Sequence, residues 1–524
     1  GASWFPDARL NFAENLLRYD DDHPALICVT ETDSSDAEPR TLSYAELRRQ
    51  VASVAHYLRN RGVEPGDRVA GWLPNIPETV IAMLATTSLG AVWSSCSPDF
   101  GAQGALDRFG QIAPKVLFSV DGYSYNGRTL PIADKVLEVA AQLESMESVV
   151  WVERIGACPS GATRFEHLTA NDRQSLTFVQ RAFNDPLYIL YSSGTTGTPK
   201  CIVHGIGGTL LQHLKEHQLH VNLTREDKLF FFTTCGWMMW NWLVSGLATG
   251  ASLVLYEGSP AYPAPDTLFD MVDRLGITLF GTSARFLSSI EKAGIKPRET
   301  HDLSSLRGVL STGSVLTREG FNYVYRDIKP EVHLASISGG TDIVSCFVLG
   351  NPDEPVWEGE IQVAGLGMAV DVVNESGEPV REEKGELVCT RPFPSCPIGF
   401  WNDSSGEKFL DAYFRRFPGI WTHGDFAEIT PHGGFIIHGR SDTVLNPGGV
   451  RIGTAEIYSQ VEQIEAIQES ICVGQDWDGD VRIVLFVVMQ PGCEFTEEVQ
   501  ATIRQNIRAH ASPRHVPQKI LEVA

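Results

Sequence analysis

Apolar residues alternate between helical and strand spacing from about residue 41 to residue 280. Residues that recur every three or four positions predict the buried face of a helix, and short β-branched or aromatic runs predict buried strands. Strands that alternate with helices favour parallel sheets flanked by helices. The helical segments include the face formed by Leu47, Val51, Val54, Ala55 and Leu58 and the stretch 78–89, and the strands are expected at 68–72, 91–95, 115–120, 187–191, 229–233, 251–256 and 277–280.

The pattern changes after Trp421, where turn residues become frequent. Beyond this point we expect strands at 435–438, around Ile471 and at 481–489, with helices from Thr454 and over 497–511. The sequence therefore predicts an α/β protein with two domains. The large N-terminal domain spans 1–438 and carries the helix-flanked, mainly parallel sheets, and a small α+β domain spans 439–524.

A run of glycines, hydroxyl residues and one lysine follows the strand expected at 187–191. Glycines let backbone N–H groups approach anionic oxygens, hydroxyls add donors and lysine adds a positive charge, so the run indicates a loop that holds the phosphates of ATP. Helical spacing from Gly208 to His220 completes an expected order of strand, loop and helix. The spacing differs from GxxxxGK[ST], and a polar turn without a ligand is the alternative. The run contains Ser192, Ser193, Gly194, Thr195, Thr196, Gly197 and Lys200.

Composition limits the classes of protein to consider. A chain of 524 residues is long for a single core, and its 43% hydrophobic and 20% charged residues are typical of a globular protein. The formal charge of −23 argues against a nucleic-acid or anionic-membrane partner. Ten scattered cysteines without a CxxC pair predict reduced thiols in a cytoplasmic protein and no metal–thiolate site. No apolar run approaches membrane-spanning length.

Four further motifs follow in order along the chain: Thr341-Asp342, residues 422–425, residues 439–442 and residues 451–457. Together with the glycine- and hydroxyl-rich run, they resemble the adenylate-forming superfamily of acyl-CoA synthetases, nonribosomal adenylation domains and luciferases. The resemblance covers most of the chain, and the segment 10–15 is similar to the acyl-CoA synthetase branch. It implies that ATP first activates a carboxylic acid as an acyl-adenylate and that the thiol of CoA then displaces AMP.

The resemblance implies roles for the nucleotide-binding residues. Asp425 and Arg440 match contacts to the ribose, and Thr341 and Arg451 match contacts to phosphate. Asp342 stands where relatives usually carry a glutamate that binds magnesium, an ion that often takes one or two carboxylates together with substrate phosphates. Thr341, Asp342 and Arg451 are therefore the candidate catalytic residues. Taken singly, the charged residues also fit solvated loops or surface ion pairs.

The residues that match the acid pocket of this family limit the range of possible substrates. Where relatives that use acetate close the pocket with a tryptophan, this chain has Gly339, and the missing indole implies room for a longer acid. The segments 336–343 and 215–220 resemble relatives that act on a short 3-oxo acid, for which His220 and Asn241 are candidate donors. A cluster of aromatic and methionine residues is equally typical of plain core. The opposite wall is expected to contain Trp237, Met238, Met239 and Val315.

Three residues are candidates for binding CoA. Gly449 matches a glycine whose missing Cβ lets the pantetheine lie against the backbone. Arg128 and Arg504 match arginines that bind phosphate, although solvated surface arginines explain both equally well. Asp442 matches the hinge about which the small domain rotates. The superfamily also has a lysine that contacts the acid and the α-phosphate; we expect it beyond Ala524, and residues up to Ala524 alone should adenylate poorly.

These features predict an AMP-forming ligase that uses ATP, CoA and magnesium and has a small acid as its substrate. One alternative is a CoA ligase for another short- or medium-chain acid. A second alternative, from a different class, is a nucleotide-binding regulatory homologue without turnover. The sequence predicts neither the platform for adenine nor the oligomeric state.

Overall fold

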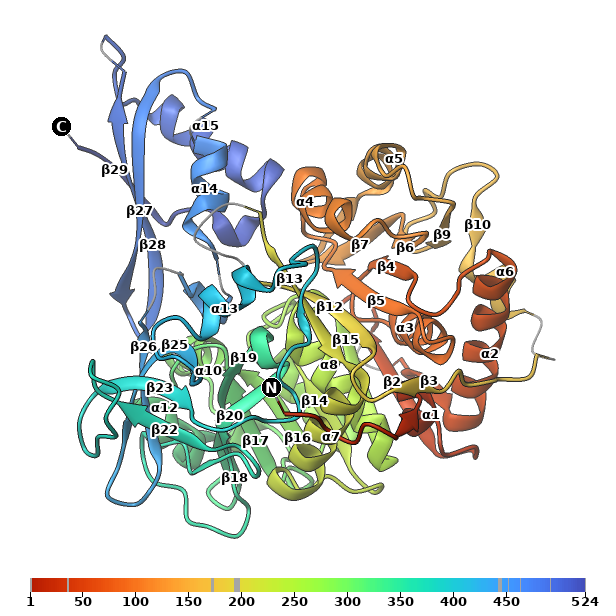
Figure 1. The fold of residues 1–524 in the computed structure, drawn as a ribbon, viewed down its shortest axis with the longest axis horizontal. Coiled ribbons are helices and arrows are strands. Elements are labelled where there is room, and N and C mark those ends of the chain that lie inside the picture. Colours follow the sequence, from red (N-terminus) through yellow and green to blue (C-terminus); the bar gives the residue numbers. More distant parts are fainter. Residues whose placement is uncertain are drawn as a thin grey trace.

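Two large sheets, both mainly parallel and flanked by helices, form the greater part of the molecule (Figure 1). This computed structural model describes residues 2–34, 37–170, 174–192, 198–441, 445–450, 452–461, 463–490 and 492–523. The α/β class predicted from the alternating pattern is confirmed. No helix within these ranges is both long and apolar enough to cross a membrane.

The first large sheet has eight strands, of which the first six are parallel and the last two antiparallel. In spatial order they are β10 (Thr163–Arg164), β9 (Ser148–Val152), β6 (Val116–Val120), β4 (Arg68–Trp72), β5 (Val92–Cys96), β12 (Pro186–Ser192), β13 (Lys200–Gly205) and β24 (Gly399–Phe400). The second large sheet has seven strands, all parallel except the last pair. They are β18 (His333–Ser336), β17 (Gly308–Thr312), β16 (Leu279–Ser283), β14 (Lys228–Phe231), β15 (Ser252–Glu257), β2 (Pro24–Thr30) and β3 (Arg40–Ser43).

Helices cover the two sheets, and the longest of them shows how the sequence specifies its start. Ser43 caps α2 by accepting a hydrogen bond from the Glu46 N–H, and the Glu46 carboxylate accepts one from the Ser43 N–H. The expected face from Leu47 to Leu58 is buried. The helices of this region are α1 (Phe12–Leu16), α2 (Tyr44–Asn60), α3 (Pro77–Ser88), α4 (Ala102–Ile112), α5 (Ala133–Gln142), α6 (Phe165–Thr169), α7 (Ile206–Lys215), α8 (Met238–Ser245), α9 (Thr267–Leu275), α10 (Ala284–Lys292), α11 (Pro297–Thr300), α12 (Arg318–Tyr323) and α13 (Glu407–Tyr413).

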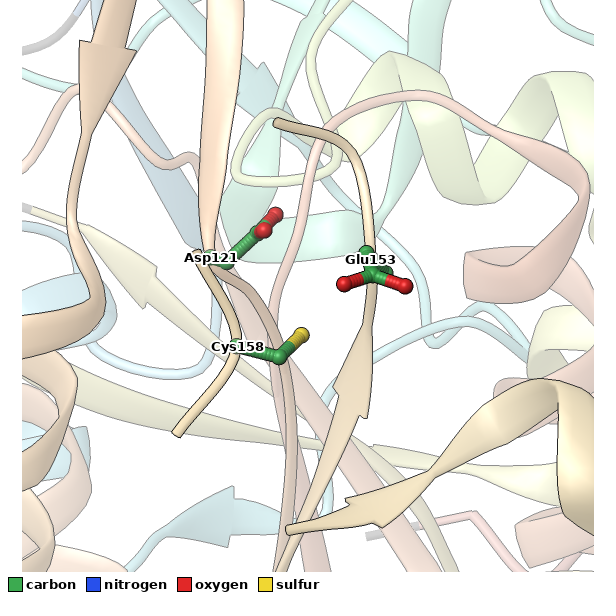
Figure 2. Close-up of side chains that lie close together, drawn as sticks. All are labelled: Asp121, Glu153 and Cys158. Carbon is green, nitrogen blue, oxygen red and sulfur yellow. The ribbon is translucent and has the colours of Figure 1, made fainter. Parts of the chain in front are cut away.

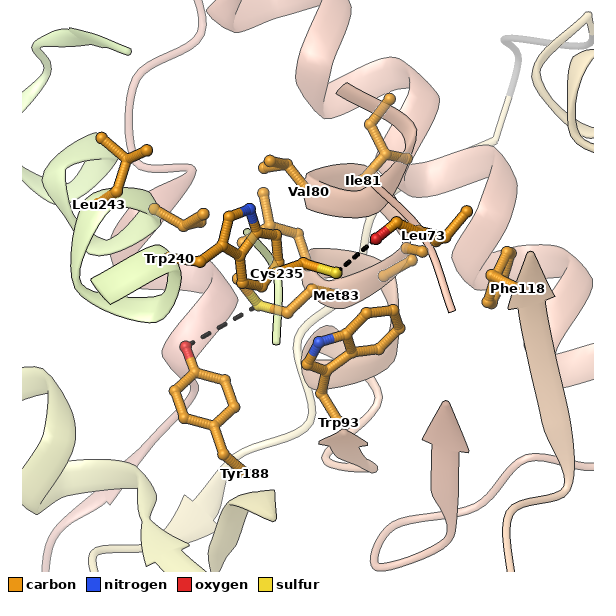
Figure 3. Packing of buried hydrophobic residues seen from close by; sticks show 14 of the residues in the cluster. Leu73, Val80, Ile81, Met83, Trp93, Phe118, Tyr188, Cys235, Trp240 and Leu243 are labelled. Carbon is orange, nitrogen blue, oxygen red and sulfur yellow. Dashed lines mark hydrogen bonds between the residues drawn. The ribbon is translucent and has the colours of Figure 1, made fainter. Parts of the chain in front are cut away.

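One continuous apolar core joins the two large sheets. Figure 3 shows a part of it, where the indoles of Trp93 and Trp240 and the side chain of Met83 pack together. Two polar atoms of this part have partners: the Cys235 thiol donates to the Leu73 carbonyl, and the Trp240 indole N–H donates to Asn75. A second core lies against the seven-stranded sheet and includes residues of α9, α10 and α12.

The expected order of strand, loop and helix around the glycine- and hydroxyl-rich run is wrong in one respect. A strand, β13, lies between the run and α7 and pairs antiparallel with β12, so the run connects two strands of a hairpin. The apolar, β-branched stretch Cys201–Val203 explains this, because it extends the sheet before the helical pattern begins. The helix then continues beyond α7 as a π-helical turn, Glu216–His220.

Smaller sheets complete the chain. An antiparallel sheet of four strands contains β22 (Val370–Val373), β23 (Gly385–Cys389), β25 (Trp421–Ile429) and β26 (Phe435–Arg440). A three-stranded sheet contains β19 (Ser338–Gly340), β20 (Ser345–Leu349) and β21 (Val363–Ala364). Two further antiparallel pairs are β1 (Arg9–Leu10) with β11 (Arg181–Ala182), which are distant in the chain, and the hairpin of β7 (Gly122–Tyr125) with β8 (Arg128–Pro131).

The C-terminal region, residues 445–523, has a core of its own. Its apolar residues come from three strands and two helices, which extend away from the large sheets in Figure 1. Strand β26 runs through position 439, where a domain boundary is predicted, and this separate core begins at Leu445. The elements are α14 (Thr454–Val461), β27 (Ile467–Trp477), β28 (Asp480–Met489), α15 (Glu497–His510) and β29 (Lys519–Glu522).

Candidate functional site

A cavity brings together chain segments that are far apart in the sequence. Its walls come from the β12–β13 hairpin, the turn after β19, α13 and the ends of strands β25 and β26. Four residues predicted to bind the nucleotide or its metal line this one cavity: Ser192, Lys200, Asp342 and Arg440. The remaining lining residues are Glu386, Asp411, Ala412, Tyr413, Arg416, Thr422, His423, Gly424 and Ser441.

The hairpin contributes a positive charge to the cavity. Lys200 is the first residue of β13, and its ammonium group lies 5.8 Å from the ring centroids of both Phe400 and Tyr413. Aromatic faces attract cations at such distances. Ser192 ends β12 opposite Lys200 in the strand register. The other predicted members of the run, Ser193, Gly194, Thr195, Thr196 and Gly197, lie outside the described residues.

Asp342 supplies a carboxylate on the other side of the cavity. It is buried in a short 3₁₀ turn, Thr341–Ile343, and its Oδ1 accepts a hydrogen bond of 2.6 Å from the Tyr413 hydroxyl. The Tyr413 ring stacks on Trp421 with centroids 3.9 Å apart and an interplanar angle of 12°. This stacking holds the hydroxyl in place, so the carboxylate is oriented through an aromatic pair. Thr341 begins the same turn and is half-buried.

Asp425 and Arg440 form an ion pair on adjacent strands. They are opposite each other in the β25–β26 register, and Arg440 Nη1 lies 2.9 Å from Asp425 Oδ1. His423 Nε2 lies 3.5 Å from Asp425 Oδ2, and its ring packs edge-on against Phe347 at 4.8 Å. The three polar groups are largely buried, so water screens them weakly. The structure thus brings both predicted ribose-binding residues together.

Glu386 is a site residue that the motifs did not reveal. This buried carboxylate accepts hydrogen bonds from Arg416 at 2.5 Å, from the Gly424 N–H at 3.1 Å and from the Ser441 hydroxyl at 2.7 Å. It therefore ties together the ends of β23, β25 and β26, beside Asp425 and Arg440. Glu386 and Tyr413 stand in an ordinary strand and an ordinary helix, and no local sequence signal distinguishes them.

Two glycines meet at the end of the predicted acid pocket. The Cα of Gly313 would lie 2.3 Å from a Cβ added at Gly449, and the carbonyl oxygen of Gly313 accepts a hydrogen bond of 3.1 Å from Asn446. Both glycines have positive φ angles, +92° and +80°. The Trp237 ring lies beside Gly313, because a Cβ at Gly313 would be 3.7 Å from its Cζ2. A residue expected to bind CoA and a wall of the acid pocket are thus adjacent.

The other predicted pocket residues differ in exposure. Met238 and Met239 are buried in the main core at the start of α8, whereas Val315 is 42% exposed. A Cβ at Gly339 would lie 2.0 Å from the carbonyl oxygen of Ser345, because β19 and β20 pack closely there. Backbone of β20 therefore stands where a side chain at position 339 would begin, so this glycine serves strand packing.

His220 is engaged by backbone groups on both sides of its ring. Its Nδ1 lies 2.8 Å from the Gly350 carbonyl oxygen, and its Nε2 accepts a hydrogen bond of 3.1 Å from the Leu366 N–H. These bonds require a neutral ring that donates from Nδ1, in agreement with a pKa lowered by burial. His220 consequently has no donor to offer a 3-oxo group. Among the residues that the structure describes, the fully buried side-chain amide of Asn241, the other candidate, has no hydrogen-bond partner.

Several charged and polar side chains are buried behind the turn at Thr341. Glu216 accepts hydrogen bonds from Ser345 at 2.5 Å and from the Trp242 indole at 2.9 Å. Burial opposes the charge of Glu216, but Lys215, His213 and the hydrogen bonds from the Ser345 hydroxyl and the Cys346 N–H lower the pKa of its carboxyl group. Burial also lowers the pKa of His204 and of His217 to about 3. Both imidazoles are therefore neutral in the folded protein at physiological pH.

The residues predicted to bind the phosphates of CoA lie near the surface. Arg128 is exposed at the start of β8, and the turn before it is held by Glu31, whose carboxylate accepts hydrogen bonds from the Asn126 and Gly127 N–H groups. Arg504 is half-buried on α15. Arg451 and Asp442, the predicted phosphate contact and hinge, lie outside the described residues.

Asp121, Glu153 and Cys158 form a compact group of potential metal ligands away from this cavity (Figure 2). The Asp121 carboxylate accepts hydrogen bonds from the N–H groups of residues 154, 155 and 157, and Glu153 pairs with Arg164. Burial, together with the nearby carboxylates, raises the pKa of the Cys158 thiol to about 11. These interactions hold a loop, so the group is explained without a metal.

Comparison with known proteins identifies the family of the chain. A family model described as AMP-binding enzyme matches residues 12–395. The chain therefore belongs to the AMP-binding enzyme family.

Within that family, the chain is similar over its whole length to proteins named acetoacetyl-CoA synthetase. It is 57% identical to the acetoacetyl-coenzyme A synthetase of Rhizobium meliloti (strain 1021), with 100% of this chain and 81% of that protein covered. It is 50% identical to the acetoacetyl-CoA synthetase of Mus musculus, over 99% and 79% of the two chains. The solved structure of acetoacetyl-CoA synthetase from Streptomyces lividans superposes with a TM-score of 0.82 at 47% identity and covers 100% and 80%.

Proposed function

We propose that this chain is an AMP-forming ligase that joins acetoacetate to CoA. Acetoacetate, ATP and CoA would give acetoacetyl-CoA, AMP and pyrophosphate. The observation that carries the proposal is the convergence of Lys200, Asp342, Asp425 and Arg440 around one site, in a chain similar over its length to proteins named for this reaction. A small acid, ATP and CoA are the proposed partners, and the ten cysteines, none in a disulfide, fit a cytoplasmic location.

The first step needs an anion-binding site with an adjacent carboxylate. An oxygen of the acid attacks the α-phosphorus of ATP, the bond to the bridging oxygen breaks, and pyrophosphate leaves with the electron pair. In such transfers the protein acts mainly by positioning groups and by stabilising charge on oxygen. We assign Lys200, Thr341 and Arg451, together with the hairpin loop, to the phosphates. Arg440 and Asp425 are assigned to the ribose, because the Asp425 carboxylate can accept hydrogen bonds from both ribose hydroxyls at once.

Asp342 fits a magnesium ligand by the chemistry of its donor group. It is a buried carboxylate in the cavity that contains Lys200, and Tyr413 fixes its orientation through one oxygen. Magnesium prefers oxygen donors and often combines one or two protein carboxylates with substrate phosphates. When bound, the ion would neutralise charge on the phosphates. The hydrogen bond from Tyr413 holds the Asp342 carboxylate in a fixed orientation at this site.

The second step needs the CoA thiol to reach the acyl-adenylate. The sulfur attacks the acyl carbon, the bond to the AMP oxygen breaks, AMP leaves with the electron pair, and the thiol proton passes to solvent. The contact of Gly449 with Gly313 supports a path for pantetheine that ends beside Trp237. Arg128 and Arg504 are proposed to bind the phosphates of CoA, and Val315, Met238 and Met239 to line the acid pocket. Gly339 is left out of this wall, because the backbone of β20 stands where its side chain would begin.

We also propose that the chain works as two domains, residues 1–438 and 439–524, which turn about Asp442. The separate core of residues 445–523 supports this division. Interfaces between domains are usually small and polar, and relative motion is then the default expectation.

The test is AMP formation by the full-length protein with acetoacetate, acetate, butyrate or no acid, each with and without CoA. AMP that depends on both acetoacetate and CoA, with kcat/KM higher for acetoacetate than for acetate, is the expected result. AMP formed best with another acid would keep the mechanism and change the substrate. No AMP with any acid, despite measurable ATP binding, would favour a regulatory nucleotide-binding protein.

A further inference from the structure

Helix α4 of the large region makes the closest backbone contacts with the C-terminal region. The Gly101 N–H at the start of α4 donates a hydrogen bond of 3.1 Å to the Ala511 carbonyl oxygen. A Cβ at Gly101 would lie 2.1 Å from the carbonyl oxygen of Ala509, and one at Gly104 would lie 3.2 Å from that of Ala511. Ala509 lies in the last turn of α15 and Ala511 follows its last residue, so the C-terminal end of that helix packs directly on α4.

Gly101 is not required by the conformation of α4 itself. Its φ of −71° and ψ of 165° are ordinary for an extended residue before a helix. The three atoms nearest to its hypothetical Cβ all belong to residues 509 and 510. Larger side chains are therefore excluded at position 101 by the docked C-terminal region alone.

About one helical turn beyond Gly104 in α4, an ion pair crosses the same interface. Arg108 Nη2 lies 3.4 Å from Glu456 Oε2 on α14, with 7% and 8% of the two side chains exposed. His515 Nε2 lies 3.4 Å from the same carboxylate oxygen, and the other ring nitrogen of His515 lies 2.8 Å from the Ser512 hydroxyl. Removing one partner of such a pair leaves a buried charge uncompensated. The pair is thus satisfied when α14 is docked on α4.

This docking has a consequence at the acid pocket. The same C-terminal region carries Gly449, whose Cα and φ of +80° allow it to lie against Gly313. An added Cβ at Gly449 would be 2.6 Å or less from three backbone atoms of Gly313, so the approach tolerates very little displacement. A rigid unit held at α4 and at Gly313 has little freedom to rotate between them.

We propose that Gly101, Gly104 and Arg108 are positioning residues for the CoA-dependent step. They fix the orientation in which Gly449 lies against the acid pocket, and they have no part in forming the acyl-adenylate. This inference rests on the two-step ligase reaction proposed above. It assigns to α4 a role in the transfer of the acyl group, which comes from the shape and charge of the buried face that α4 turns toward the C-terminal region.

The test separates the two steps in the full-length protein. Gly101→Ala adds only a Cβ that collides with the docked region, and Gly110→Ala is its matched control, because position 110 lies in the same helix and a Cβ there meets nothing within 4 Å. Acetoacetate-dependent ATP–pyrophosphate exchange measures the first step. Single-turnover formation of acetoacetyl-CoA from preformed acetoacetyl-adenylate measures the second.

For Gly101→Ala we expect the second step to slow by about 100-fold, as for a small misplacement of reacting groups, with exchange within about twofold of the unchanged protein. Gly110→Ala should leave both steps within about twofold. Equal losses in the two steps, or an unchanged second step in a folded Gly101→Ala protein, would overturn the proposal. Failure of the unchanged protein to catalyse exchange with any acid would instead refute the proposed function.

A second measurement concerns the ion pair. Arg108→Gln and Glu456→Gln should each slow the second step by about tenfold or more, and the double variant should lose no more than the stronger single variant, since both changes remove one interaction. Losses that multiply, or losses confined to exchange, would show that the pair does not act as one docking contact.

Discussion

The contacts inside the large region and the contacts between it and residues 445–523 differ in kind. Inside, one apolar core joins two sheets through buried rings such as those of Trp93 and Trp240. Between the regions, the contacts described above are backbone against glycine and charge against charge. Apolar burial stabilises many similar arrangements, whereas a glycine contact or a buried ion pair is satisfied in one arrangement only. The contacts inside the large region therefore mainly stabilise the fold, whereas the contacts between the two regions mainly fix the orientation of residues 445–523.

The largest effect is expected from damage to the apolar core. Trp240→Ala should lower the free energy of unfolding by about 3–5 kcal/mol, because a fully buried indole leaves a cavity. Denaturant unfolding followed by circular dichroism measures this. The control, Trp477→Ala, removes an indole that is 56% exposed and stacks only on Arg482, and it should cost less than about 1 kcal/mol. Similar losses of unfolding free energy for the two variants would show that the apolar core of the large region does not dominate stability.

A change at the cavity should affect catalysis more than stability. Asp425→Asn keeps the size of the side chain but removes the charge that pairs with Arg440 at 2.9 Å, and kcat/KM for ATP should fall by about 100-fold. Initial rates of AMP formation at varied ATP measure it. Asp371→Asn removes the partner of Arg381 in a more exposed pair of 2.7 Å and should change the rate by less than about twofold. Comparable rates for Asp425→Asn and the unchanged protein would refute the ribose assignment.

Acid should weaken the large region through its buried histidines. Burial lowers the pKa of His204 and His217 from 6.5 to about 3, so below pH 6.5 the unfolded chain binds protons that the folded protein does not. The contribution of these neutral histidines to the free energy of unfolding is fully present above pH 6.5. It is lost as the pH falls toward 3, by about 1.4 kcal/mol per pH unit for each histidine.

His217→Gln tests this account, because glutamine still offers an N–H to the Trp242 carbonyl, 2.8 Å from His217 Nε2, and does not titrate. Between pH 6.5 and 4.5, the loss of unfolding free energy should be about 2 kcal/mol smaller than in the unchanged protein. Urea midpoints across this range measure it. The exposed control, His167→Gln, should leave the pH dependence unchanged. An identical pH dependence for His217→Gln would show that the slope has another source.

The smallest effect is expected at the rim between the two regions. Lys292 pairs with Asp478 at 2.6 Å, but 50% and 65% of the two side chains are exposed. Lys292→Ala should therefore change the rate of the CoA-dependent step by less than about twofold, since exposed pairs contribute about 0.5 kcal/mol or less. A tenfold loss in single-turnover transfer would mean that orientation depends on surface charge as much as on α4.

Much of the fold could be predicted because local patterns agree with it. The strand expected at 68–72 coincides with β4, and the helix expected at 78–89 lies within one residue of α3 at each end. The omission of β13 shows the limit. Its apolar, β-branched residues favour a strand, but the helical spacing that follows masks them, and the pairing with β12 and β24 that completes the strand is not encoded in spacing.

The candidate site divides in the same way. The chain by itself determined the chemistry of the motifs, since carboxylate, arginine, lysine and glycine have fixed charge, donors and conformational range. The residues around Lys200 indicate a phosphate-binding loop, and the resemblance of the other motifs to a known family points to Asp342, Asp425 and Arg440. Only the tertiary structure decided which neighbours those groups have. Tyr413 orients Asp342, Glu386 joins three strands, backbone occupies both sides of the His220 ring, and β20 packs against Gly339. Apart from the contact of Gly339 with the neighbouring strand β20, these contacts join residues far apart in the chain, and the free energy that selects them comes from the packing of the whole molecule.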